Sequence, residues 1–179
     1  MKLKNILVPV VTILVMTAIL FGASAGLSDL RAENIQKEHI AMMQTVLPGS
    51  MDFVIEPYTG EDENIRSVHK AENGFVIETV TQGYAGEIVM MIGVNNDGHV
   101  TGLVVRDLSE TLGLGRNALT DHAFLAQFLN TSGEAAVGEN VDAITGATVT
   151  SKAIARSVNS AIAVVTGADV TSSATTWGG

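Results

Sequence analysis

The sequence predicts an α+β protein: a single domain with an antiparallel sheet and flanking helices, preceded by one N-terminal transmembrane helix. An uncharged apolar run opens the chain, segments rich in β-branched residues fill its middle, and an amphipathic helical pattern follows them. Strands and helices do not alternate in the regular βαβ order of a parallel sheet. We therefore expect a transmembrane anchor over residues 1–27, a linker helix over 28–49, the domain over 50–166 and a flexible tail over 167–179.

The apolar run extends from Ile6 through Gly26 without a charged residue. It is long enough to cross a membrane, which takes about 20 such residues in a helix. Two lysines precede it and charges of both signs follow it, which indicates a cytoplasmic N-terminus and an extracytoplasmic domain. The alternative is a cleaved signal peptide with Ala23-Ser24-Ala25 as its cleavage site. The apolar core is longer than the roughly 7–15 residues of such a peptide, which favours the uncleaved anchor. Both interpretations export the rest of the chain.

The segment after the apolar run is predicted to be helical. Residues 28–47 place apolar side chains at three- and four-residue spacing, and Pro48-Gly49 ends the pattern. A polar loop is expected over residues 56–64. Residues 75–81 are rich in β-branched side chains and predict a strand.

A hairpin and two helices are predicted next. Residues 87–94 and 99–106 form the two strands of the hairpin, because Asp97-Gly98 between them favours the positive φ angles of a tight turn. Residues 121–129 predict a short amphipathic helix. The last helix is expected to begin near Thr150-Ser151 and to end near Val165. Its apolar stripe comprises Ile154, Val158, Ile162 and Val165.

The composition of the 179 residues excludes several classes of function. Ten basic side chains stand against 19 acidic ones, a net charge of −9, and an acidic surface repels nucleic-acid phosphates. The absence of cysteine excludes disulfides, thiolate-ligated iron–sulfur clusters and a lipoprotein anchor. The four histidines lack metal-ligand spacing. We expect neither a nucleic-acid partner nor a metal site, so a redox cofactor would have to be organic.

One candidate site leads directly into the last helix. Asp142 to Ser151 combine a small-residue turn with four hydroxyl side chains. Helix N-termini favour anions through their free amides and the macrodipole, and Gly146 and Ala147 leave space for a bulky group. The alternative is helix capping by Thr150 or Ser151, which is the better interpretation of these residues taken alone.

A second candidate segment, Ser109 to Gly115, directly follows the hairpin. Two glycines alternate with leucines there, and loops rarely carry leucines without something apolar to cover. A flat aromatic ligand across Leu112 and Leu114 accounts for the pattern, with close backbone approach at Gly113 and Gly115. A leucine pair tucked into the core accounts for it equally well. The spacing is not the G-x-G-x-x-G of a dinucleotide fold.

Three segments together resemble the FMN-binding domain found in the G subunit of the Rnf electron-transport complex and in the related C subunit of the sodium-pumping NADH:quinone reductase. They are Gly83-Tyr84-Ala85-Gly86, Glu110 to Gly115, and Asp142 to Ser151. The third is the most specific, since it contains the family's D-x-x-[ST]-G-A-T motif for flavin attachment. Leu112 departs from the family's usual proline and Ala85 from a common glycine. The first departure puts the rigidity of that loop and its ring contacts in doubt.

The resemblance implies that FMN is covalently bound by a phosphoester to Thr148. Asp142 and Thr145 take the acidic and hydroxyl places of the motif, and the domain over residues 50–166 is then the FMN-binding domain. No catalytic and no metal-ligating residue is expected. The cofactor-binding residues implied are Thr148, Asp142, Thr145, Gly146, Ala147, Glu110, Thr111, Leu112, Gly113, Leu114, Gly115 and Tyr84.

The attachment is expected to need a second protein. A threonine hydroxyl is a poor nucleophile unless an adjacent base or a metal activates it, and no base is evident beside Thr148. The resemblance implies a flavin transferase that uses FAD and a divalent metal.

The function implied is that of an electron-transfer component in a membrane-bound, ion-translocating ferredoxin:NAD oxidoreductase of the Rnf type. The chain would lie in the cell membrane, with its N-terminus in the cytoplasm, its FMN domain outside and other membrane subunits of the redox-driven ion pump as partners. Two alternatives keep the flavin: an extracytoplasmic electron-transfer or sensory module outside any ion pump, and the C subunit of a sodium-pumping NADH:quinone reductase. A third is an exported structural or adhesive domain without a cofactor.

Overall fold

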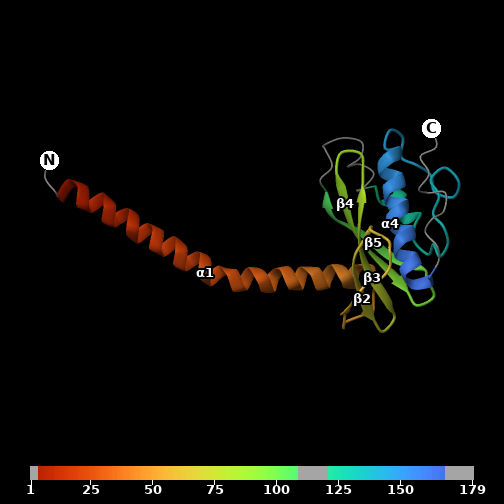
Figure 1. The fold of residues 1–179 in the computed structure, drawn as a ribbon, viewed down its shortest axis with the longest axis horizontal. Coiled ribbons are helices and arrows are strands. Elements are labelled where there is room, and N and C mark those ends of the chain that lie inside the picture. The colour runs from red at the N-terminus through yellow and green to blue at the C-terminus, as the bar shows by residue number, and fades with distance from the viewer. Residues whose placement is uncertain (1–3, 109–120, 168–179) are drawn as a thin grey trace. The chain divides into compact units, whose positions relative to one another are not determined.

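The structure, a computed structural model, describes residues 4–108 and 121–167, without the side chains of residues 4–9, 23–32 and 107–108 (Figure 1). The chain divides into two compact units, Met1–Ala41 and Met42–Gly179. Helix α1 (Lys4–Val46) begins in the first unit and ends in the second. The predicted Glu110 to Gly115 loop and most of the predicted tail lie outside the described residues.

The first unit consists of helix α1 up to Ala41. Large apolar side chains are exposed along it from Val10 to Phe21. Further along, Lys37 and Glu33 form an exposed i,i+4 ion pair of 2.7 Å, which adds only a few tenths of a kcal/mol. Within the side chains that the structure describes, no helix has both the length and the apolar character that a membrane span requires.

The second unit is built on a five-stranded antiparallel sheet whose spatial order, β1-β2-β3-β4-β5, follows the chain. The predicted strand over 75–81 and the predicted hairpin are confirmed. The hairpin turn is closed by Asn95 Oδ1, which accepts from the amides of Asp97 (3.0 Å) and His99 (2.8 Å). Gly98 has the expected positive φ of 83°. The strands are β1 (Val54–Glu56), β2 (Ile65–Ala71), β3 (Gly74–Gln82), β4 (Glu87–Asn95) and β5 (Val100–Leu108).

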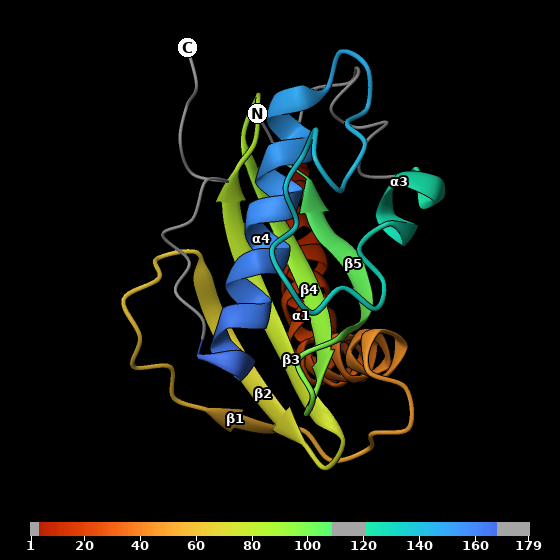
Figure 2. The same cartoon turned by 90° about the vertical axis from the view of Figure 1, so that its right-hand side faces the viewer.

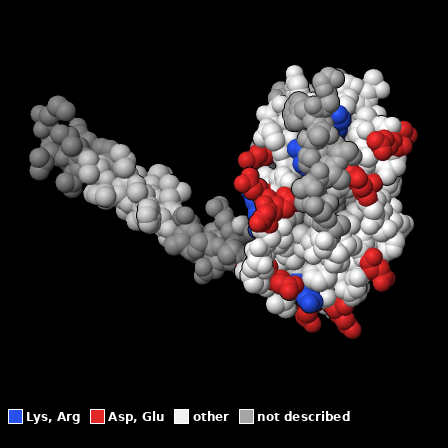
Figure 3. All heavy atoms as spheres, turned by 45° about the vertical axis from the view of Figure 1, so that its right-hand side comes forward, with Lys and Arg blue, Asp and Glu red and all other residues white. Residues whose placement is uncertain are grey.

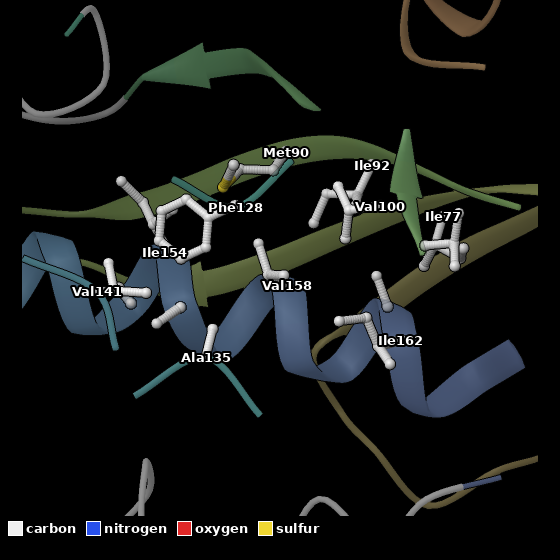
Figure 4. Close-up of a cluster of buried hydrophobic side chains, with 14 of the residues drawn as sticks. Ile77, Met90, Ile92, Val100, Phe128, Ala135, Val141, Ile154, Val158 and Ile162 are labelled. Atoms are coloured by element: carbon white, nitrogen blue, oxygen red, sulfur yellow. The ribbon is translucent and has the colours of Figure 1, made fainter. Parts of the chain in front are cut away.

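Helix α4 (Thr148–Thr166) covers one face of the sheet and packs on β3 and β4 (Figure 2). Three members of the predicted stripe, Ile154, Val158 and Ile162, are buried in one cluster with Met90 and Ile92 of β4 (Figure 4). The fourth, Val165, is half-buried and packs against the same cluster. Phe128, Ala135 and Val141, from the segment between the sheet and α4, complete this core. A fully buried aliphatic side chain contributes about 1.5–3 kcal/mol, so this layer holds α4 firmly on the sheet.

Helix α3 (His122–Ala126) is shorter than the amphipathic helix predicted over 121–129. Asp121 caps it, because its Oδ1 accepts from the amides of Ala123 (2.9 Å) and Phe124 (3.1 Å). The rings of Phe124 and Phe128 meet edge to face at 5.3 Å between centroids. Turn geometry over residues 127–130 replaces the predicted last helical turn, and it still delivers Phe128 to the core.

The C-terminal end of α1 covers the opposite face of the sheet. Met43, Val46 and Leu47 are buried there in a second core cluster with Val76 and Met91. As predicted, the helix stops before Pro48-Gly49, and Gly49 has a positive φ of 87°. Since both faces are covered, seven consecutive residues of β4, from Ile88 to Val94, are buried.

Two glycines allow this close approach of α1. Gly93 of β4 and Gly102 of β5 are cross-strand partners, and the backbone of Val46 lies directly over both. A Cβ at Gly102 would stand 2.8 Å from the Val46 Cα, and one at Gly93 would collide with the Val46 carbonyl. The Thr101 hydroxyl donates to that carbonyl at 2.6 Å, which fixes the end of the helix on the sheet.

We predict that Gly93→Ala destabilises the second unit by about 1–3 kcal/mol, because the added methyl overpacks the Val46 backbone. Urea unfolding of the purified chain, followed by circular dichroism, measures this. Gly133→Ala is the matched control, since nothing lies within 4 Å of the Cβ it adds, and it should change stability by less than about 0.5 kcal/mol. Equal effects of the two substitutions would contradict the close packing described.

Candidate functional site

The ends of three strands and the start of α4 meet at one end of the sheet. Gln82, the last residue of β3, pairs with Glu87, and the last residue of β5, Leu108, pairs with Ile88. The Gly83–Gly86 turn and the end of β5 therefore share this end. Figure 2 shows the lighter-blue start of α4 at the same end.

A buried polar contact sets the position of α4 along the sheet. The Thr81 hydroxyl of β3 lies 2.9 Å from the Ser157 hydroxyl and donates to the Ala153 carbonyl at 3.2 Å. Ala153 lies in the N-terminal half of α4 and Ser157 at its middle, so the first half of the helix lies over the end of β3. Two of the segments predicted to form the site, the Gly83–Gly86 turn and the Asp142–Ser151 segment, thus converge although about 60 residues separate them in the chain.

Thr148 is the first residue of α4, and it is exposed. Ala147 occupies the N-cap position without a side-chain capping bond. The first intrahelical hydrogen bond runs from the Ser151 amide to the Ala147 carbonyl at 2.9 Å. The amides of the first turn consequently have no partner within the helix, and they point toward the end of the helix that carries Thr148.

The last helix begins at Thr148, two residues before the expected start near Thr150-Ser151, and capping by either of those residues is wrong. Both lie inside the first turn of α4 and are fully buried. The Ser151 hydroxyl donates to the Ala147 carbonyl (2.9 Å) and accepts from the Ile144 amide (3.3 Å), so it ties the preceding turn to the helix. Among the described residues, the buried Thr150 hydroxyl has no hydrogen-bond partner.

A tight turn over residues 144–147 delivers the chain to α4. The Ala147 amide donates to the Ile144 carbonyl at 2.9 Å, and Gly146 has a φ of 79°. Positive φ at the third position is what a type II turn requires, and glycine adopts it without strain. Thr145 and Gly146 are exposed, whereas Ala147 is buried. Local geometry therefore accounts for the glycine at position 146, and burial accounts for the small side chain of Ala147.

Asp142, the acidic residue of the motif, is exposed and held through its backbone. Its amide donates to Gln127 Oε1 at 2.8 Å, and Gln127 Nε2 donates back to its carbonyl at 3.4 Å. Its carboxylate makes no hydrogen bond or ion pair to the residues that the structure describes. The carboxylate is thus free to act on a ligand or on a modifying enzyme.

Asn159 of α4 anchors the segment that leads to Asp142. Its Oδ1 accepts from the Ala135 amide at 2.8 Å, and its Nδ2 donates to the Ala135 carbonyl at 3.1 Å. The sequence did not single out Asn159 or Gln127, because each is one amide side chain among polar neighbours. The one sequence feature that could have indicated a structural role for Asn159 is its position directly beside the apolar stripe of α4.

Of the residues predicted to contact the flavin ring, Tyr84 is the one that lies within the described part of the chain. It lies in the β3–β4 turn, which the Gly83 amide closes on the Gly86 carbonyl at 2.8 Å, and it is 79% exposed. Among residues 4–108 and 121–167, no group of three or more histidine and acidic side chains could hold a metal ion. The described part of the site therefore consists of an exposed hydroxyl, an uncapped helix end and an exposed aromatic ring.

Comparison with known proteins matches the part of the chain that contains these residues. The FMN-binding domain family matches residues 83–163, from the β3–β4 turn through most of α4. The chain is 32% identical to the G subunit of the ion-translocating oxidoreductase complex of Methanosarcina acetivorans, over 90% of this chain and 93% of the relative. It is 31% identical to the G subunit of the Na(+)-translocating ferredoxin:NAD(+) oxidoreductase complex of Acetobacterium woodii, over 73% and 75% of the two chains.

A third relative matches over a shorter stretch. It is the G subunit of the proton-translocating ferredoxin:NAD(+) oxidoreductase complex of Clostridium ljungdahlii, which is 35% identical over 51% of this chain and 53% of its own length.

We predict that Asn159→Ala destabilises the second unit by about 1–3 kcal/mol, because it leaves the buried amide of Ala135 without a partner. Thermal or urea unfolding measures the loss. Lys152→Ala, an exposed position on the same helix, should stay within about 0.5 kcal/mol of the wild type. If Asn159→Ala unfolded like Lys152→Ala, the anchoring role of Asn159 would be refuted.

Proposed function

This chain belongs to the family of the G subunits of ion-translocating oxidoreductase complexes, and we propose that it carries FMN through a phosphoester to Thr148. FMN, when bound, supplies the chemistry of accepting electrons and passing them on. The chain itself supplies the attachment point, the position of the cofactor and its electrostatic environment.

The exposed hydroxyl of Thr148 on the uncapped start of α4 is the observation that carries this proposal. A phosphodiester keeps one negative charge, and the free amides and macrodipole of a helix N-terminus stabilise an anion. Thr150, two residues further on, is fully buried. Of these two threonines, only Thr148 presents its hydroxyl to an enzyme that modifies the folded domain.

The Thr148 hydroxyl is not activated by its surroundings. Among the described residues it makes no hydrogen bond to a histidine, a carboxylate or another base, and such a base is what a hydroxyl nucleophile requires. A flavin transferase that brings its own activating groups is therefore part of the proposal. Asp142, with its free carboxylate, and the exposed Thr145 and Gly146 form the surface that such an enzyme would recognise.

The turn that carries Tyr84 lies at the same end of the sheet as Thr148 and offers a large aromatic surface that the core does not use. We assign Tyr84 to the flavin ring environment on this ground. The loop residues are assigned to that environment from their motif and because they follow β5 in the chain. They are Glu110, Thr111, Leu112, Gly113, Leu114 and Gly115.

The relatives are subunits of multisubunit complexes, and two of them are named as parts of ferredoxin:NAD(+) oxidoreductases that translocate ions. By extension, this chain would relay electrons between other subunits of a redox-driven ion pump. The apolar run Ile6–Gly26 would anchor it in the membrane, with the FMN domain on the extracytoplasmic side. Covalent attachment suits that side, where a dissociated flavin would be lost.

We predict that Thr148→Val abolishes covalent flavin while the fold persists, because the hydroxyl is exposed and valine has nearly the same shape. The chain is co-expressed with a flavin transferase and examined by in-gel flavin fluorescence after denaturation. Mass mapping of the peptide that contains residue 148 locates the flavin. Thr166→Val, an exposed threonine at the other end of α4, should keep full fluorescence. Flavin found on Thr150 or Ser151, or a dark wild-type band, would refute the assignment.

We also predict that the chain stays with the membrane after alkaline carbonate extraction and co-purifies with integral membrane subunits. A hydrophobic anchor resists alkali, whereas a peripheral protein held by charge is released. Solubilised membranes are passed over an affinity tag at Gly179, and the bound subunits are identified by mass spectrometry. Flavinylated protein that is recovered alone would contradict membership of a complex and would favour a flavin module outside an ion pump.

A further inference from the structure

The edge of the sheet at β1 carries an apolar surface that the rest of the second unit does not cover. Six large hydrophobic or aromatic side chains of the described second unit are exposed, and four of them fall within eight residues of sequence. Met51 is 81% exposed, Val54 66% and Ile55 68%. Clustered exposure of this kind is typical of an interaction site, whereas single exposed side chains are not informative. The four residues are Met51, Val54, Ile55 and Tyr58.

A groove of about 400 Å³ lies beside these side chains. Buried Ala71, which belongs to the core cluster under the end of α1, lines it, so the groove reaches the edge of that cluster. Its other lining residues are Asp52, Val54, Ile55, Glu56, Pro57, Lys70 and Glu72. We call this feature the β1 groove.

The sheet ends at β1, which pairs with β2 and with no other described strand. An edge strand offers unpaired backbone groups to which a further strand can add, and such addition is a common mode of peptide recognition. Pro57 directly follows β1 and cannot donate a backbone hydrogen bond. An added strand would therefore be short, with a few residues in register with Val54–Glu56.

The charge of the β1 groove selects its partner. Its lining residues include three carboxylates (Asp52, Glu56 and Glu72) and one ammonium (Lys70), a net charge of −2. The Lys70 ammonium lies 5.4 Å from the centre of the Phe75 ring and is engaged there. Acidic side chains also outnumber basic ones on the face of the molecule in Figure 3. Complementary charge excludes wrong partners and speeds the encounter with right ones.

We propose that the β1 groove binds a short extended segment of another polypeptide, in which apolar residues alternate with lysine or arginine. Alternate side chains of a strand point to opposite sides, so Ile55 lies on one side of β1 and Val54 and Glu56 lie on the other. The apolar set of an added strand would cover Ile55, while its basic set would lie beside Val54 and face Glu56. A second copy of this chain would bring the same carboxylates against each other. An anionic lipid surface is repelled by them as well. That the segment belongs to a membrane subunit of the same complex rests on the proposed function.

Photo-crosslinking in the intact complex tests the proposal. Ile55→benzoylphenylalanine is introduced into the full chain in cells, and the membranes are irradiated. The matched control is Leu129→benzoylphenylalanine, an exposed apolar position outside the groove. The expected result is a crosslink from position 55, mapped to a short segment with alternating apolar and basic residues. A crosslink to lipid or to a second copy of this chain would overturn the proposal. So would a crosslink yield at position 55 no higher than the yield at position 129.

Charge reversal provides the second measurement. Glu56→Lys and Glu72→Lys should each lower the amount of the chain that co-purifies with the complex by about tenfold, as loss of a close charge pair does. Glu139→Lys, an exposed carboxylate elsewhere in the second unit, should leave that amount unchanged. Equal recovery of all three variants would show that the acidic lining does not select the partner.

Flavin content, read in the same samples, separates this inference from the proposed function. The Thr148→Val variant should still crosslink through position 55, because no residue of the Asp142–Ser151 segment lines the β1 groove. A wild-type chain that crosslinks but carries no flavin would refute the proposed attachment and would not affect the proposed binding at the β1 groove. A wild-type chain that is fluorescent but does not crosslink would refute the binding at the groove and would not affect the attachment.

Discussion

The packing of α4 across β3 and β4 is the contact on which the rest of the second unit depends. It buries Ile154, Val158 and Ile162 on the sheet, and the Thr81 contacts with Ala153 and Ser157 fix the position of the helix along β3. Non-directional apolar burial holds the helix down but allows it to slide, whereas hydrogen bonds in a dry interface are specific to one register. The position of Thr148 follows from that register.

The opposite face explains why the sheet can be covered on both sides by so small a domain. Each helix needs an apolar surface, and β4 supplies one to each through alternate residues: Met90 and Ile92 face α4, while Met91 faces the end of α1. The Gly93–Gly102 pair removes the side chains that would hold the Val46 backbone away. Since neighbouring strands are shared, a disturbance under α1 reaches the strands that support α4. The two layers therefore depend on one sheet rather than stabilising the domain separately.

Much of this architecture follows from local sequence signals, and the missing parts depend on contacts distant in the chain. Asp97-Gly98 specifies its hairpin because the turn conformation is a property of those residues themselves. Strand β2 escaped prediction because its charged and polar side chains suit a half-exposed strand and a loop equally well. Its pairing with β3 decides between them. Thr150 and Ser151 looked like caps, since hydroxyls before a helix usually are, but the Thr145-Gly146 turn starts the helix two residues earlier. The hydrogen bonds made by the side-chain amides of Gln127 and Asn159 join segments 15 and 24 residues apart, and no local sequence pattern predicts them.

The charges of α4 bear on why an anion is suited to this position. The chain carries a net charge of −9, yet none of its 19 acidic side chains lies on α4. The charged residues of the helix are Lys152 and Arg156, one and two turns after Thr148, and residues four apart lie on the same helical face. A cation near a helix N-terminus is unfavourable by itself, because the macrodipole is positive there. A phosphodiester on Thr148 would offset that repulsion, since it faces both the free amides and the ammonium of Lys152. The start of α4 thus combines the positive end of a macrodipole with two cationic side chains in an otherwise acidic chain, and the proposed anion is a group that this combination stabilises.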